Sequence, residues 1–110
     1  MQNTDFIEIK GPASLAELVA VVDPAAPATA DDYIVLRVSP TVSVTLQYDS
    51  VDTDTWPYMI TVESSSDDVT PVRDQTMRLL AKLRQRNWTL QATSDADDFR
   101  RLITPFSATA

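Results

Sequence analysis

The stretch that decides the fold is residues 33–64, which read YIVLRVSPTVSVTLQYDSVDTDTWPYMITVES. Apolar residues recur there at every second position in three runs, a pattern typical of strands with one buried and one solvated face. The inward positions are Ile34, Leu36 and Val38, then Val42, Val44, Leu46 and Tyr48, then Tyr58, Ile60 and Val62. Residues 39–41 have the length of a hairpin loop, and residues 49–57 form a longer, acidic loop. The centre of the chain is therefore predicted to be an antiparallel meander.

Two helical patterns flank this meander. Ser14 and Glu17 form a capping box that opens the first helix, and Thr70 followed by Pro71 supplies an N-cap and a favoured first residue for the second. Apolar spacing of three and four residues predicts the buried stripes. These are Leu15, Leu18, Val19 and Val22 in the first helix, and Val72, Thr76, Leu79, Leu80 and Leu83 in the second.

The remaining segments complete the predicted order. Residues 4–10 and 88–93 alternate like strands, and Phe99, Leu102 and Ile103 predict a short last helix that Pro105 stops. The order β-α-β-β-β-α-β-α indicates an α+β fold. We expect one domain over residues 1–110, with an antiparallel or mixed sheet of about five strands and both main helices packed on one face.

The opposite face of this sheet is predicted to be polar and nearly uncharged. A partner could dock there with little desolvation of charge, but a solvated antiparallel face has the same composition. Its predicted residues are Ser43, Thr45, Gln47, Thr61, Thr89, Gln91 and Thr93, with Arg37 and Glu63 as its few charges.

Composition argues against catalysis. The 110 residues include no Cys and no His, and Gly11 is the only glycine, so thiol and imidazole chemistry and glycine-rich phosphate loops are excluded. Asp49, Asp52 and Asp54 lack the glycine and glutamate spacing of a calcium-binding EF-hand. We predict a protein that is not an enzyme and needs no cofactor or metal, and no apolar run approaches the ~20 residues of a membrane-spanning helix.

Charge is distributed unevenly along the chain. The net charge is −7, but residues 1–68 carry twelve acids against two bases, whereas residues 69–110 carry four acids against seven bases. An acidic protein is a poor ligand for nucleic acid or anionic membranes and a good one for a basic partner. The asymmetry indicates either an interaction surface or two halves that neutralise each other in the fold.

The acidic loop carries the candidate partner-binding residues. Aromatic residues anchor protein interfaces, and acidic residues steer basic partners toward them. The candidates are Asp49, Asp52, Asp54, Trp56 and Tyr58. The alternative is that Trp56 closes the end of the core where the loop enters the third strand of the meander.

One further feature carries a family resemblance. A Leu-rich helix over residues 75–86 runs into Asn87-Trp88-Thr89-Leu90-Gln91 in a small acidic chain. This layout, over residues 30–103, resembles immunity proteins of bacterial polymorphic toxin systems. The resemblance implies a cytoplasmic inhibitor that binds a cognate toxin domain, and it carries over no site residue. A small structural or adaptor component of a phage or secretion assembly is the alternative, and an enzyme or ligand-binding domain with an unrecognised pocket is a third possibility.

Overall fold

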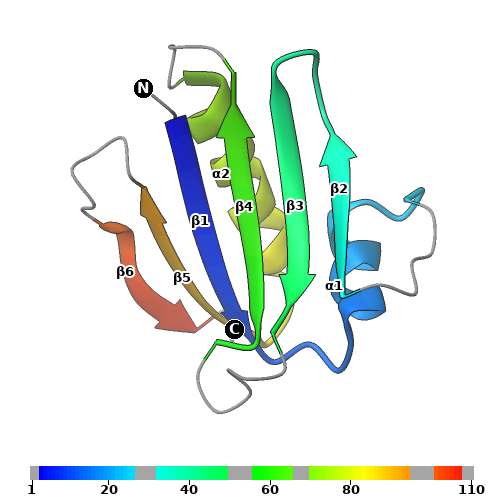
Figure 1. Ribbon diagram of the computed structural model, residues 1–110. Coiled ribbons are helices and arrows are strands. Elements are labelled where there is room, and N and C mark those ends of the chain that lie inside the picture. The colour runs from blue at the N-terminus through cyan, green and yellow to red at the C-terminus, as the bar shows by residue number, and fades with distance from the viewer. Residues whose placement is uncertain (1–2, 27–31, 50–55, 66–69, 95–100, 108–110) are drawn as a thin grey trace.

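The computed structural model describes residues 3–26, 32–49, 56–65, 70–94 and 101–107, and the last of these segments as backbone only. One six-stranded antiparallel sheet runs through it, in the order β2-β3-β4-β1-β5-β6. Both helices lie on the same side of this sheet (Figure 1). The elements are β1 (Asn3–Lys10), α1 (Leu15–Val22), β2 (Tyr33–Arg37), β3 (Val42–Tyr48), β4 (Tyr58–Ser64), α2 (Thr70–Leu83), β5 (Thr89–Ser94) and β6 (Arg101–Ser107).

The predicted α+β class, the meander and the placement of the two main helices are confirmed. β2, β3 and β4 are consecutive neighbours, and the inward residues of β3 and β4 are buried as the alternation requires, except that Tyr48 is half-buried. Val38, also predicted to face inward, lies beyond the end of β2 and is 45% exposed. Ile34 and Leu36 of β2 are half-buried, because this strand lies at the edge of the sheet.

The last element is the main correction. In place of the expected helix stopped by Pro105, Arg101–Ser107 forms a sixth strand that pairs with β5, for example Leu90 with Phe106. Three apolar positions were too short a pattern to distinguish helix from strand, and pairing gives β5 hydrogen-bond partners on its second side. Proline is tolerated here because β6 is an edge strand.

β1 lies in the middle of the sheet, between β4 and β5. Ile7 pairs with Ile60 on one side and with Ala92 on the other, so β1 joins the meander to the β5-β6 pair. Ile7 and Ile9 point toward the helices and are fully buried.

The helices follow their sequence signals closely. The Ser14 hydroxyl oxygen accepts from the Glu17 backbone N–H (3.1 Å), and a Glu17 carboxylate oxygen accepts from the backbone N–H of Ala13 (2.8 Å). The five predicted stripe residues of α2 are all buried. Lys82 Nζ donates to the carbonyl of Val22 (2.8 Å), which ties α2 to the last turn of α1.

Gly11 ends β1 in a conformation that other residues rarely adopt. Its φ is 134°, and a Cβ atom added there would lie 2.5 Å from Cδ1 of Trp88. The Trp88 ring therefore packs directly on the backbone at the end of β1, while the Arg86 guanidinium stacks above it, 5.7 Å from the ring centroid.

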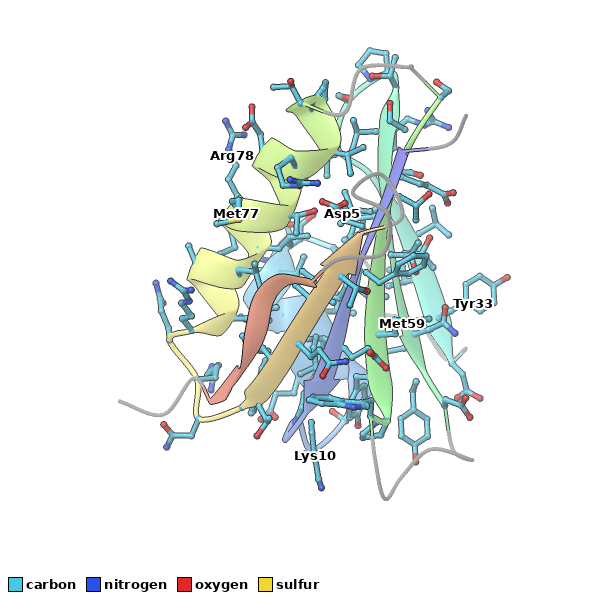
Figure 2. All side chains as sticks on the ribbon, turned by 90° about the vertical axis from the view of Figure 1, so that its left-hand side faces the viewer. Asp5, Lys10, Tyr33, Met59, Met77 and Arg78 are labelled. Atoms are coloured by element: carbon cyan, nitrogen blue, oxygen red, sulfur yellow. The ribbon has the colours of Figure 1, made fainter. Side chains whose placement is uncertain are left out.

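A buried carboxylate connects β1 to α2. Asp5 has no exposed surface, and its Oδ2 accepts from the Thr76 hydroxyl (2.7 Å) and from Arg73 Nε (3.3 Å). Figure 2 shows Asp5 between the sheet and α2. Its Oδ1 has no hydrogen-bond partner among the described residues. The hydrogen bonds from Thr76 and Arg73 therefore offset most of the free-energy cost of burying this carboxylate.

Leu83→Ala should lower the free energy of unfolding by about 2–5 kcal/mol, because a fully buried side chain leaves a cavity. Met77→Ala on the same helix is the control: Met77 is 47% exposed and should cost about 0.5 kcal/mol or less. Denaturant melts measure both. Equal losses would contradict the assignment of the two faces of α2.

Thr76→Val should cost about 1–3 kcal/mol, because it removes a donor from a buried carboxylate while keeping the shape of the side chain. The double variant Asp5→Val/Thr76→Val should recover much of this loss, since no buried charge then lacks its donor. Urea melts of the three proteins complete the comparison. A double variant less stable than Thr76→Val alone would show that the carboxylate stabilises the fold in another way.

Candidate functional site

Within the described residues, no helix lies on the face of the sheet that points away from α1 and α2. Strand register arranges its side chains in three rows across the sheet, which together we call the open face. The first row is Tyr33, Gln47, Met59, Glu8 and Gln91, the second is Val35, Thr45, Thr61, Phe6 and Thr93, and the third is Arg37, Ser43, Glu63 and Thr4. Figure 2 shows Tyr33 and Met59 pointing away from α2.

The open face combines hydroxyl and amide side chains with a few apolar ones. The second row carries no charge, with Phe6 half-buried between Thr61 and Thr93. In the first row, Glu8 Oε1 accepts from Gln91 Nε2 (3.0 Å), so this carboxylate is already held by its neighbour. A partner covering the second row would displace water without stripping any charged group of its hydration.

Sequence reasoning recognised the polar residues of this face but overlooked its apolar ones. Phe6, Tyr33, Val35 and Met59 stand at the outward positions of their strands, and Tyr33 and Val35 are 56% and 55% exposed. The same alternation that placed Thr45 and Thr61 outward also placed these four residues there. The period-two alternation therefore predicts these four apolar side chains on the outward face as well.

Trp56 and Asp49 lie together beside the first row. Both are half-buried, and they line a small hollow of about 60 Å³ with Glu8, Gln47 and Met59 of that row and with Pro57. The Asp49 backbone N–H donates to the carbonyl of Pro57 (2.8 Å), which closes the two ends of the acidic loop. Two of the predicted partner-binding residues are thus adjacent to the open face, whereas Asp52 and Asp54 lie outside the described residues.

Tyr58 does not share this surface. It faces the helices, is only 5% exposed, and packs on Tyr48 with ring centroids 5.1 Å apart and planes tilted by 44°. The prediction that Trp56 and Tyr58 form one recognition surface is therefore corrected. The alternation that continues into β4 turns Tyr58 toward the core, on the side opposite Met59.

Burial also sets the acidity of this phenol. Desolvation, followed by the neighbouring Tyr48 and the negative charge of Glu17, raises the pKa of Tyr58 above its ordinary value of 10.0. The Tyr58 phenol consequently loses its proton at a higher pH than an exposed tyrosine does.

Four exposed basic residues lie on α2 and the turn after it, whereas Arg37 belongs to the open face. Arg78, Lys82, Arg84 and Arg86 are exposed on α2 and the turn after it, and Figure 2 shows Arg78 and Met77 pointing away from the sheet. Arg73 with Asp5 is the one ion pair found between the acidic and basic parts within the described segments.

Another hollow, of about 320 Å³, lies between the β2-β3 hairpin and the start of α2. Its walls include Val38, Val42 and Pro71, and Asp74 beside Arg78 is the one carboxylate among its described lining residues. Across the described residues there is no group of three or more carboxylates that could hold a metal ion, and no helix long and apolar enough to cross a membrane.

No family model, curated protein or solved structure matches this chain. Its function is therefore inferred from its own residues.

Tyr58→Phe should make stability less sensitive to alkaline pH. Because the folded pKa is raised, the unfolded chain loses this proton first as the pH increases. The stability that the neutral Tyr58 phenol contributes is complete below the unfolded pKa of about 10, and it is lost as the pH rises through the pKa of the folded state. Urea melts between about pH 8 and pH 11 measure the effect. Tyr33→Phe removes an exposed phenol as the control, and equal flattening in both variants would contradict the argument.

Proposed function

We propose that this chain is a non-catalytic protein-binding module that contacts its partner with the open face and the adjoining hollow at Trp56. Within that class, we propose an immunity protein that binds and neutralises a cognate bacterial toxin domain in the cytoplasm. The observation that carries the proposal is a sheet face on which no described helix packs, with an uncharged central row and several apolar side chains.

The energetics of this face favour docking of a protein. Phe6, Met59 and Val35 offer apolar area, while the hydroxyl and amide groups of Thr45, Thr61 and neighbouring residues can form hydrogen bonds with a partner. Trp56 at the border of the first row is the residue type that most often anchors an interface.

The net negative charge of the chain favours a basic partner, and the bases on α2 favour one orientation of that partner. The net charge of −7 attracts a cationic protein, and the acids lie mainly in residues 1–68. The exposed bases of α2 lie on the helix side, away from the open face. A cationic toxin domain would be repelled from the helices and guided toward the sheet and the acidic loop.

The structural or adaptor role remains the second candidate, because one feature favours it. β2 forms a free edge of the sheet, which could continue into a neighbouring subunit. The test of toxin binding also separates the two roles, since an adaptor would not protect cells from a toxin.

If a toxin domain is encoded beside this gene, Trp56→Ala should weaken binding to it, mainly by increasing the dissociation rate, by roughly 10-fold or more as expected of an aromatic anchor. Thr61→Lys, which places a charge in the uncharged row, should act in the same direction. Met77→Lys on the helix side is the matched control and should bind normally. Surface plasmon resonance provides the rates.

Asp52→Lys/Asp54→Lys should instead slow association and flatten its dependence on salt, because steering is an effect on the encounter rate. Measurements should begin at low salt, since the Debye length falls to about 8 Å at physiological ionic strength.

Normal binding by all open-face variants together with a defect in Met77→Lys would move the interface to α2. A wild-type chain that neither binds the domain nor protects cells from it would refute the immunity proposal.

A further inference from the structure

β2 is an edge strand without the usual protection against strand pairing. Edge strands in monomeric proteins are commonly blunted by lysine, proline or a bulge. β2 contains none of these within Tyr33–Arg37, and its only charge is Arg37 at the end (Figure 1). Tyr33 and Val35 are also the two most exposed large hydrophobic side chains among the described residues.

The hydrogen bonds to β3 fix which backbone groups β2 directs outward. The Asp32 carbonyl accepts from the Tyr48 N–H (2.8 Å), and the Val38 N–H donates to the Val42 carbonyl (3.1 Å). Even-numbered residues of β2 therefore direct their N–H and C=O groups toward β3. Because these groups alternate in an antiparallel ladder, those of Tyr33, Val35 and Arg37 point to the free edge.

We propose that two copies of this chain pair through β2, antiparallel and centred on Val35. In this register Val35 faces Val35 of the second copy, and Tyr33 faces Arg37. All three outward-directed residues then fall in hydrogen-bonded pairs, so every outward N–H and C=O group of β2 gains a partner. Centring the pair on Tyr33 or on Arg37 would leave some of these groups unpaired.

The side chains complement each other in the same register. On the open face, each Arg37 lies opposite a Tyr33 ring, a favourable cation–π and cross-strand pair, and the two Val35 side chains touch at the two-fold axis. Arg37 already donates from Nη1 to the Pro40 carbonyl (3.2 Å), which leaves its other nitrogens for the partner. On the helix side, Ile34 meets Leu36, and both are half-buried in the single chain.

No like charges face each other in this arrangement, because the only charged residue of β2 is opposite tyrosine. The two sheets become one continuous sheet, and the open faces of the two copies lie side by side. Although the seam borders the open face, self-pairing is measured on the isolated chain without any toxin domain, so its failure and the failure of toxin binding are told apart.

A cysteine cross-link tests the register directly, because the chain has no cysteine of its own. Hydrogen-bonded antiparallel partners have Cα atoms about 5.5 Å apart, within the ~4.4–6.8 Å that a disulfide spans. Val35→Cys should therefore form a disulfide-linked dimer on mild oxidation. Tyr33→Cys should not, because its counterpart lies about 13 Å further along the strands, and neither should Thr45→Cys, three strand spacings or about 14 Å from its counterpart.

Mixing Tyr33→Cys with Arg37→Cys should restore cross-linking, since these residues face each other across the axis. Equal cross-linking by Val35→Cys, Tyr33→Cys and Thr45→Cys would indicate random collision and overturn the proposal.

Sedimentation velocity over a range of concentrations supplies the second test. The wild-type chain should approach twice its monomer mass at high concentration, as should Val35→Thr. Val35→Pro removes only an N–H that points away from β3, and Val35→Lys places two ammonium groups face to face, so both should remain monomeric. Circular dichroism and melting would establish that these variants are folded. A wild-type chain that stays monomeric at every concentration would overturn self-pairing and leave the edge to a strand from another protein.

Discussion

The whole sheet depends on the two hydrogen-bonded ladders of β1. β2, β3 and β4 form one antiparallel unit and β5 with β6 forms another, and among the described strands only β1 joins them. Its inward side chains, Ile7 and Ile9, extend the core across that junction, and Asp5 fastens the strand to α2 through Thr76 and Arg73. At its other end, Gly11 allows Trp88 to pack against the backbone. β1 is thus fixed near one end by the hydrogen bonds of buried Asp5 and at the other by the close contact between Gly11 and Trp88.

The parts of the fold that follow from neighbouring residues were predictable from the sequence. The stripe from Val72 to Leu83 and the alternation of β3 and β4 each arise within one element, where spacing alone determines the buried side. The central position of β1 was not predictable, because strand order depends on pairings such as Ile9 with Leu90, which no local pattern encodes. Arg101–Ser107 was misassigned for the same reason: its pairing with β5 outweighed a short helical spacing.

The candidate site shows the same division. Trp56 and Asp49 were selected as neighbours of an acidic loop, and the structure places them beside Glu8, a residue distant in sequence. Tyr58 was selected with them because it is close in sequence, yet the pleat of β4 turns it to the opposite face. The open face itself is assembled from five strands, so its rows, such as Val35 with Thr45 and Thr61, exist only after the register is known.

The central place of β1 also has a consequence for how the chain folds. This strand is synthesised before either of its partners, and Ile7 and Ile9 must wait for β4 and then for β5 before both of its edges are paired. Contacts between residues so distant in sequence form slowly, since the entropy of closing a long loop is lost before the ladder is gained. On the ribosome, β1 therefore emerges with both edges unpaired, and unpaired strand edges favour aggregation until their partners are made.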